Sequence, residues 1–350
     1  MQKVAIIGTT SWGITLGMLL VAKGVEVRLW ARTEREAKKF RQNDLDQVRF
    51  PDITLPPEMI ITSHMDDAID SVNAVLLPVP SATMRQNISQ VAGYLDKSTL
   101  IISAAKGLEI GSNKRMTEVI AEEIDPRFRS NICALSGPQL AKEIMRNLPA
   151  AAVIASDNTS AARKAQRLLI TPSFCVFTNS DVIGVELGGA LKNILALGAG
   201  IADGLGYGDN AKAAFMTRGL TEITALGLIM GANPLTFSGL AGLGDVIATC
   251  ASPLSRNHYV GVELAKGRPL AEITSGMAEV AEGINTTLVA ENLAQIHGLE
   301  MPITEKIHQI LYEGEDPVQA AAELMGGNVR HELSGRRWRL FSFLRKGRKS

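Results

Sequence analysis

Lys192 stands in a row of small residues that could bring it against a ligand. Gly184, Gly188, Lys192, Ala196 and Gly200 recur at every fourth position, a spacing that places side chains in one row on a helix. Glycine inside a helix costs about 1 kcal/mol relative to alanine, so three glycines in one row call for a reason. A row without bulky side chains lets another backbone or a ligand approach the ammonium group. The spacing alone leaves both a tight packing face and an active site open.

Lys106 and Asp245 are the residues best placed to work with Lys192. Lys106 ends an apolar, strand-like run at 99–105, and Asp245 follows the glycine-rich stretch 238–244. Burial and a second cation lower the pKa of a lysine, which suits it to exchange a proton near neutral pH. Reduction of a carbonyl by a nicotinamide needs such a proton donor. The alternative for Asp245 is that it only caps a helix.

Ser255, Arg256 and Asn257 begin a predicted helix and could together bind a phosphate group. Free N–H groups at a helix N-terminus, a guanidinium and an amide are all suited to that anion. The alternative for Arg256 is an ion pair on the protein surface.

The N-terminal stretch has the pattern of a dinucleotide-binding strand–helix–strand unit. An apolar run at 3–8 precedes a turn and a helix, and a second strand follows at 25–30. Thr10 stands where a second glycine usually lets the backbone approach the pyrophosphate, and it therefore weakens the motif. The N-terminus of the helix, near Ser11 and Trp12, still offers N–H groups to an anion.

The end of the second strand bears on the choice of cofactor. Arg32 stands where NAD-specific proteins often carry an acidic residue for the ribose, and an arginine there can bind the 2′-phosphate of NADP. A solvent-exposed arginine is the alternative, and Glu34 stays open as a partner for NAD. We expect NAD or NADP as the cofactor.

Strand and helix patterns alternate up to about residue 180, and helical patterns alone follow. Gly8, Pro78, Lys106 and Gly137 each follow a predicted strand, and the carboxyl ends of strands in an open parallel sheet face the binding crevice. Further strands are expected within 73–81, 99–109, 131–144, 150–156 and 174–178, and helices at 181–203, 209–231, 233–238, 243–251, 255–266, 285–298, 302–313 and 316–325. The pattern predicts an α/β protein: a Rossmann-type dinucleotide-binding domain followed by an all-α domain.

The overall composition favours a two-domain enzyme from a reducing compartment. A chain of 350 residues is long for one core, and its 36 basic and 36 acidic residues leave no net charge to attract nucleic acid. Its three cysteines are far apart and suit neither a disulfide framework nor a zinc site. We expect no metal, no signal peptide, no apolar run long enough to span a bilayer, and a cytoplasmic location.

Five segments together resemble the bacterial NAD(P)-dependent glycerol-3-phosphate dehydrogenase family: GVELGGALKN, SGLAGLGD, PLSRN, SAAKGLE and LSGPQLAKE. The resemblance extends from about residue 3 to residue 333. It implies a phosphogluconate dehydrogenase-like fold, with a Rossmann-type domain at 1–180 and an all-helical substrate-binding and catalytic domain at 181–333. It also implies reversible hydride transfer between NAD(P)H and dihydroxyacetone phosphate, which gives sn-glycerol 3-phosphate for phospholipid synthesis.

The resemblance further implies roles for individual residues, with Lys192 as the catalytic proton acceptor and donor. The implied substrate positions are Lys106, Gly137, Gln139, Lys192, Asp245, Ser255, Arg256 and Asn257, and the implied cofactor positions are Ser11, Trp12, Arg32, Lys106, Ala141, Arg256, Val280 and Glu282. The chain departs from the family at Thr10 and at Gln139–Leu140, where Ser or Thr followed by Phe is usual. Because the lysines, Asp245 and Arg256 are kept, we interpret both departures as tuning of affinity.

The stretch 334–350 lies outside the resemblance and is rich in basic and aromatic residues. It is expected to be either a flexible solubilising tail or a peripheral contact with an anionic membrane. A homodimer is left open, and nucleic acid is not an expected partner. Two other functions stay open as well: a related dehydrogenase for another small phosphorylated alcohol, which a substrate panel would distinguish, and a catalytically impaired nucleotide-binding regulator.

Overall fold

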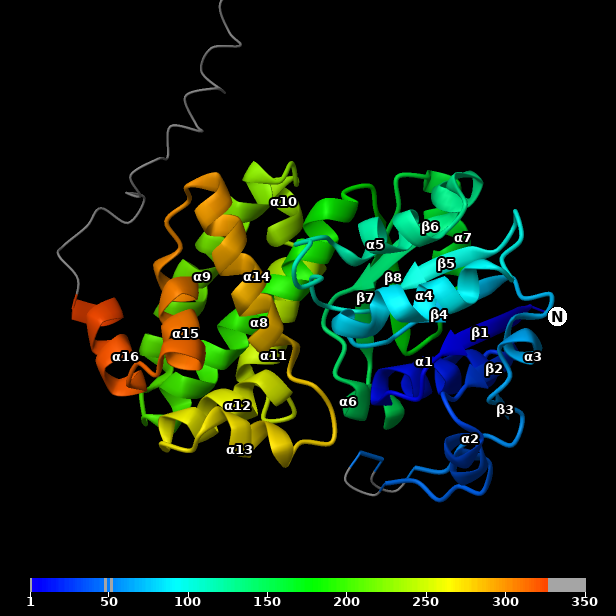
Figure 1. The fold of residues 1–350 in the computed structure, drawn as a ribbon, viewed down its shortest axis with the longest axis horizontal. Helices are drawn as coiled ribbons and strands as arrows, with labels where there is room; N and C mark the ends of the chain where they lie inside the picture. Colours follow the sequence, from blue (N-terminus) through cyan, green and yellow to red (C-terminus); the bar gives the residue numbers. More distant parts are fainter. Residues whose placement is uncertain (1, 47–48, 51–52, 327–350) are drawn as a thin grey trace, which may run out of the picture.

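The computed structural model describes residues 2–46, 49–50 and 53–326. An eight-stranded sheet with helices on both faces is followed along the chain by a cluster of helices that lies beside it (Figure 1). The predicted fold class, a Rossmann-type N-terminal domain followed by an all-α C-terminal domain, is confirmed. The tail at 334–350 lies outside the described residues.

The sheet has the strand order β3-β2-β1-β4-β5-β6-β7-β8. The strands are β1 (Lys3–Ile7), β2 (Glu26–Trp30), β3 (Ile60–Thr62), β4 (Ala74–Leu77), β5 (Leu100–Ser103), β6 (Ile132–Ser136), β7 (Ala150–Ala155) and β8 (Phe174–Asn179). Neighbouring strands are parallel except β6 and β7, which are antiparallel. The expectation of an open parallel sheet is therefore wrong for β7 and β8. The three-residue β3 was not predicted, because it is too short to show a pattern.

Helices cover both faces of this sheet. They are α1 (Ser11–Ala22), α2 (Glu34–Arg41), α3 (Met65–Ile69), α4 (Met84–Ala92), α5 (Met116–Glu123), α6 (Ala141–Met145) and α7 (Thr159–Leu169), with 3-10 turns η1 (Ser81–Thr83) and η2 (Pro126–Asn131). Alternate residues of β1 point to opposite faces: Ile6 joins one apolar cluster, and Ile7 joins the other. Burial on both faces explains why the central strands are almost wholly apolar.

The helical domain begins with α8 (Val182–Gly204), which follows β8 directly. The remaining elements are α9 (Asp209–Ile229), α10 (Pro234–Phe237), the π-helical η3 (Leu240–Gly244), α11 (Asp245–Ala251), α12 (Arg256–Ala265), α13 (Leu270–Ser275), α14 (Glu282–His297), α15 (Pro302–His308), the π-helical η4 (Gln309–Glu313) and α16 (Pro317–Gly326). The predicted helices are present, and α13 is additional. Asp181 caps α8 by accepting the Gly184 N–H at 2.9 Å, as its position before the apolar run suggests.

The central helix α8 is mostly apolar because other elements surround it. By length and composition alone, Val182–Gly204 and Pro234–Ala251 could each cross a membrane. The expectation that no apolar run reaches that length is therefore wrong. In α8, however, 94% of the most apolar 18-residue stretch is buried inside the protein. Its composition is that of a core helix.

The small-residue row of α8 serves close packing at most of its positions. A Cβ at Gly188 would lie 2.5 Å from the carbonyl oxygen of Ala241, and a Cβ at Gly200 would overlap the carbonyl oxygen of His258 in α12. Lys192, in the same row, instead lines a cavity. Both explanations of the row therefore apply, each to a different turn of the helix.

Candidate active site

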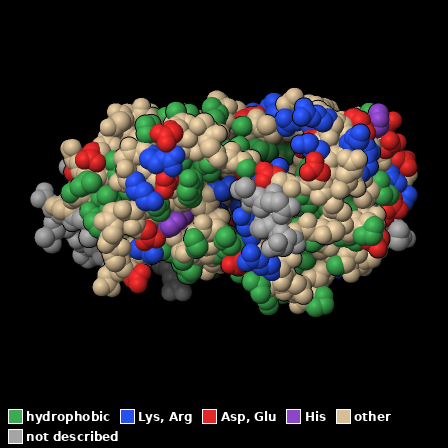
Figure 2. Space-filling view, turned by 90° about the horizontal axis from the view of Figure 1, so that it is seen from below, with side chains coloured by type: hydrophobic (Ala, Val, Ile, Leu, Met, Phe, Trp, Pro, Cys, Tyr) green, Lys and Arg blue, Asp and Glu red, His purple; other side chains and the backbone are tan. Residues whose placement is uncertain are grey.

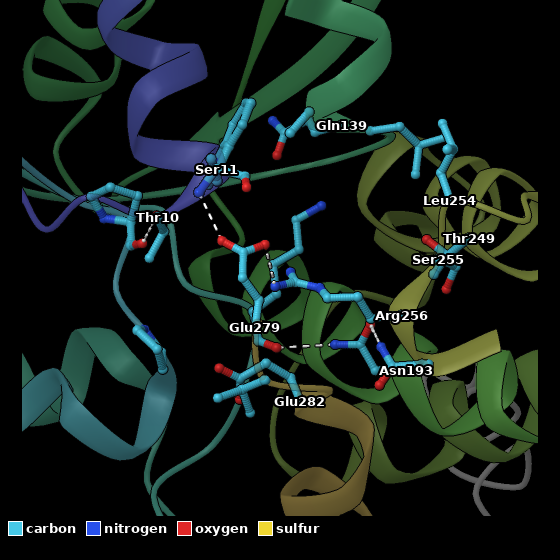
Figure 3. A pocket seen from close by; sticks show the side chains of 18 of the residues that line it. Thr10, Ser11, Gln139, Asn193, Thr249, Leu254, Ser255, Arg256, Glu279 and Glu282 are labelled. Carbon is cyan, nitrogen blue, oxygen red and sulfur yellow. Dashed lines mark hydrogen bonds and ion pairs between the residues drawn. The ribbon is translucent and has the colours of Figure 1, made fainter. Parts of the chain in front are cut away.

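A cavity of about 630 Å³ lies where the carboxyl edge of the sheet meets the helical domain. Lys and Arg side chains gather along the groove between the two parts of the molecule (Figure 2). The lining comes from the segments after β1, β4, β5 and β6, from α8, α11 and α12, and from the segment 276–282. Figure 3 looks into this cavity.

Asp245 bridges two lysines in the cavity lining. Its Oδ2 accepts a hydrogen bond from Lys106 Nζ at 2.7 Å, and its Oδ1 accepts one from Lys192 Nζ at 2.9 Å. Thr249, one turn further along α11, accepts from Lys192 Nζ at 2.6 Å and donates to Asp245 Oδ1 at 3.0 Å. Residues from the sheet domain and from two helices of the second domain therefore share one buried polar cluster.

The electrostatics of this cluster follow from burial and from its two ammonium groups. Burial lowers the pKa of Lys106 to about 8; the Asp245 carboxylate opposes this shift, and the Lys192 charge adds to it. For Asp245, burial opposes ionisation, yet the two ammonium groups hold its pKa below the ordinary value. The cluster thus contains a stable carboxylate and a lysine that can lose its proton near pH 8.

Lys106 is held in place by contacts to both domains. Its Nζ donates to the carbonyl oxygen of Gly137 at 2.6 Å, and its own carbonyl oxygen accepts from Asn193 Nδ2 at 3.1 Å. Gly137, which follows β6, has a φ of 117°, a conformation that favours glycine. Its contribution is therefore a backbone carbonyl that points at the lysine.

The Ser255–Arg256–Asn257 segment begins α12, and its three side chains do different things. Ser255 caps the helix by accepting the His258 N–H at 3.2 Å. Asn257 donates to Asn193 Oδ1 at 2.9 Å and accepts the Gly283 N–H at 2.9 Å, so its amide holds the helices together. The Arg256 side chain is half exposed at 49% and extends along the cavity. A guanidinium in this position is suited to bind a phosphate.

The N-terminus of α1 lies in the same cavity. Gly8 has a φ of 97°, and Thr10 has an extended backbone that any residue adopts. The Thr10 hydroxyl accepts the Gly13 N–H at 3.0 Å and donates to the Pro78 carbonyl at 2.7 Å. The departure at Thr10 therefore supplies a helix cap without backbone strain. The N–H groups of Ser11 and Trp12 belong to the first turn, whose donors have no acceptor within the helix; that of Ser11 donates to Glu279 Oε1 at 2.8 Å.

Most of the residues predicted for the site are brought together here. Those that line the cavity are Ser11, Trp12, Lys106, Gln139, Ala141, Lys192, Asp245, Ser255, Arg256, Asn257, Val280 and Glu282. Gly137 contributes only through the contact of its carbonyl with Lys106. Arg32 does not line the cavity; its backbone N–H donates to Glu36 at 3.1 Å and its side chain is exposed. Glu34 is bound to Arg41 and Ser63, away from the cavity.

Thr249, Arg49 and Glu279 are among the lining residues that were not predicted from the sequence. Thr249 lies four residues after Asp245, a helical spacing that could have indicated it. Arg49 and Glu279 come from an irregular stretch and from the segment before α14, where no motif marks them. Their place in the site depends on the tertiary fold.

Buried polar atoms in the lining fit a bound ligand. Within the described residues, Trp12 Nε1 and Gln139 Oε1 are buried and make no hydrogen bond in the protein, although buried polar groups are nearly always paired. Gln139 Nε2 donates to the Ser136 carbonyl at 3.1 Å. Glu282 accepts the Ser81 N–H at 2.8 Å. No group of three or more His, Cys, Asp or Glu side chains in the described residues could hold a metal ion.

Two family models match the chain. The model of the NAD-dependent glycerol-3-phosphate dehydrogenase N-terminus matches residues 3–162, and that of the C-terminus matches residues 181–322. The glycerol-3-phosphate dehydrogenase [NAD(P)+] of Dehalococcoides mccartyi is 56% identical over 99% of this chain and 97% of its own length. The enzyme of the same name from Pelotomaculum thermopropionicum is 44% identical over 95% of each chain.

A solved structure agrees with these relatives. The crystal structure of glycerol-3-phosphate dehydrogenase from Coxiella burnetii is 37% identical, has a TM-score of 0.87, and covers 93% of this chain and 98% of its own. Sequence and fold both match along nearly the whole chain. This chain belongs to the NAD-dependent glycerol-3-phosphate dehydrogenase family.

Proposed function

We propose that this protein is an NAD(P)-dependent sn-glycerol-3-phosphate dehydrogenase that interconverts sn-glycerol 3-phosphate and dihydroxyacetone phosphate. The observation that carries the proposal is the Lys106–Asp245–Lys192 cluster, which lies in the same cavity as the N-terminus of α1. A bound nicotinamide would supply or accept the hydride. The protein must then move the hydroxyl proton and hold the substrate.

We assign the proton transfer to Lys192. In the oxidation, its Nζ accepts the proton of the C2 hydroxyl; in the reduction, its ammonium group returns that proton to the carbonyl oxygen. Asp245 and Thr249 hold the Nζ in place through their hydrogen bonds. Lys106 adds a second positive charge beside the developing alkoxide, which stabilises that charge in a buried site.

The substrate phosphate is assigned to the start of α12. Arg256 offers a guanidinium, and the α12 N-terminus offers a positive dipole end. Ser255 and Asn257 shape this end of the cavity, and Gln139 is assigned to the substrate on the opposite side. Gly137 acts through its carbonyl contact with Lys106.

The cofactor is assigned to the N-terminus of α1 and its surroundings. The N–H groups of Ser11 and Trp12 suit a pyrophosphate, and Trp12 Nε1 is a buried donor that still needs an acceptor. The other assigned contacts are Arg32, Lys106, Ala141, Arg256, Val280 and Glu282. We assign Arg32 to the 2′-phosphate of NADP because a guanidinium can bind that group bidentately, so NAD and NADP are both proposed.

Loss of Lys192 tests the assignment. With dihydroxyacetone phosphate as substrate, the wild-type protein should consume NADH or NADPH, which is followed by absorbance. Lys192→Ala should lower kcat by at least about 100-fold, the scale of a lost general acid–base group. Lys164→Ala, an exposed lysine on α7, is the matched control and should keep the wild-type rate. No turnover by the wild-type protein with either cofactor would refute the proposed function.

Further expectations remain predictions. We place the domain boundary near residue 180, with the second domain reaching residue 333, and we expect a cytoplasmic location. A homodimer stays open, and light scattering would test it. Contact of 334–350 with anionic membranes is tested by co-sedimentation with anionic vesicles. Equal pelleting with and without these residues would end that idea.

A further inference from the structure

Glu279 places its carboxylate at the N-terminus of α1. It lies in the segment 276–281, which joins α13 to α14 and lines the cavity. Its Oε1 accepts the N–H of Ser11 at 2.8 Å, across 268 positions of the chain. Figure 3 shows this contact in the middle of the cavity.

The same carboxylate also holds two arginines. Arg256 Nη1 lies 2.9 Å from Oε2, and Arg49 Nη2 lies 3.3 Å from Oε1. Burial opposes the charge on Glu279, yet Arg256, the Ser11 N–H and Arg49 together hold the pKa of the carboxyl below its ordinary value. Glu279 is therefore a largely covered anion, with 18% of its side chain exposed, and it is bound by a helix N-terminus and two guanidinium groups.

Those partners are the ones that a dinucleotide needs. In a Rossmann-type unit the pyrophosphate sits at the N-terminus of the first helix, where it accepts backbone N–H bonds. A carboxylate and a pyrophosphate are both anions, so they cannot share this position without strong repulsion. Arg256, bound by Glu279, is also the arginine assigned to the substrate phosphate.

Few backbone contacts hold the segment that carries Glu279. Within the described residues, the backbone of 278–280 makes no hydrogen bond with other groups. The neighbouring Ala278 and Val280 are exposed. The side-chain contacts of Glu279 are thus the main polar links between this segment and the α1 N-terminus, and a competing anion can replace them.

We propose that Glu279 is an internal occupant of the pyrophosphate position, which the dinucleotide displaces on binding. Displacement frees Arg256, so binding of the dinucleotide should strengthen binding of the substrate phosphate at that arginine. This inference rests on the proposed function. It adds to that function an autoinhibitory contact that couples the two ligands.

The first test compares the affinities of the free protein for NADH and NADPH by titration calorimetry. Glu279→Gln keeps the size of the side chain but removes its charge, and should lower the Kd by at least about fivefold, the scale of one anion contact at a helix N-terminus. Glu279→Ala should act in the same direction. Glu272→Gln is the matched control, because Glu272 of α13 is paired with Arg268 and does not line the cavity. The Kd of this variant for each dinucleotide should equal that of the wild type.

The second test addresses the coupling between the two ligands. Without dinucleotide, sn-glycerol 3-phosphate should bind Glu279→Gln at least about fivefold more tightly than it binds the wild type, because Arg256 is then free. An equal or weaker affinity of both Glu279 variants for the dinucleotides overturns the displacement. Unchanged binding of sn-glycerol 3-phosphate overturns the role of Arg256 in this coupling. Failure of all the proteins to bind either dinucleotide instead removes the proposed function, and this inference with it.

Discussion

Asp245 holds the ammonium groups of two lysines close together in the cavity. Its two carboxylate oxygens bind different lysines, Lys106 at 2.7 Å and Lys192 at 2.9 Å. With 2% of its side chain exposed, the carboxylate interacts with both ammonium groups where water screens them weakly. One aspartate thus keeps two cations close together, and each cation can assume a separate task.

The charge on Lys106 leads to a prediction about pH. A lysine is charged below its pKa, and for Lys106 that value is about 8. If its charge supports the substrate carbonyl, kcat/KM for reduction of dihydroxyacetone phosphate should fall as pH rises through about 8, by about tenfold per unit at the steepest. The profile should be measured from pH about 6.5 to about 9.5, a range that spans this pKa.

Lys106→Arg is the informative variant for this profile. Arginine stays charged at every pH in that range, so the loss near pH 8 should disappear even though the absolute rate is lower. A decline of the same shape in wild type and variant would show that another group titrates there.

At the scale of elements, one face of α8 both packs against other helices and lines the cavity. Its glycines let α12 and η3 come to backbone contact, as the overlaps of a Cβ at Gly200 and at Gly188 show. The π-helical η3 then leads directly into Asp245, the first residue of α11; such wide turns are frequent at functional sites. Close packing of these elements is what brings Asp245 within reach of Lys192.

Gly200→Ala tests whether α8 needs a glycine at this position to pack closely against α12. The added Cβ would overlap the carbonyl oxygen of His258, and a backbone atom cannot rotate away as a side chain can. We expect a loss of about 3 kcal/mol in the free energy of unfolding, at the upper end for overpacked cores. Urea denaturation followed by circular dichroism measures it.

Gly93→Ala is the control for this substitution. Gly93 has a φ of −70°, and a Cβ added there would have nothing within 4 Å. Its free energy of unfolding should stay within about 0.5 kcal/mol of the wild type. A Gly200→Ala protein as stable as this control would show that α8 and α12 can move apart at little cost.

At the scale of the molecule, a buried ion pair links the two domains. Glu186 of α8 accepts from Arg115 Nη1 at 2.7 Å, and from the N–H and hydroxyl of Thr117 in α5 at 2.8 and 2.6 Å. Burial raises the pKa of Glu186, while the Arg115 charge opposes that shift. The arginine therefore compensates a carboxylate that would otherwise be costly to bury.

Arg115→Ala should weaken this link by leaving Glu186 without its cation. We expect a loss of about 3 kcal/mol in the free energy of unfolding, as when one partner of a buried pair is removed. Adding Glu186→Gln should recover part of the loss, because the remaining group is then neutral. Thermal and urea unfolding of the single and double variants would measure this, and a double variant less stable than Arg115→Ala would contradict the explanation.

The sequence by itself determined the features that depend on local pattern. These features are the strand–helix–strand start, the helix cap at Asp181 and the row around Lys192. Each depends on residues that lie close together in the chain. Their physical basis is the period of side chains along a strand or helix and the satisfaction of helix ends, so they can be predicted before any packing is known. The resemblance of short segments to a family supplied the site residues.

Only the tertiary structure decided how these parts meet. The Lys106–Asp245 pair spans 139 positions and the Ser11–Glu279 contact spans 268. The reversed direction of β7 and the place of Glu279 likewise have no signature in the residues around them. Contacts of this length depend on how whole elements pack, and they bring Asp245 to both lysines and the Glu279 carboxylate to the N-terminus of α1.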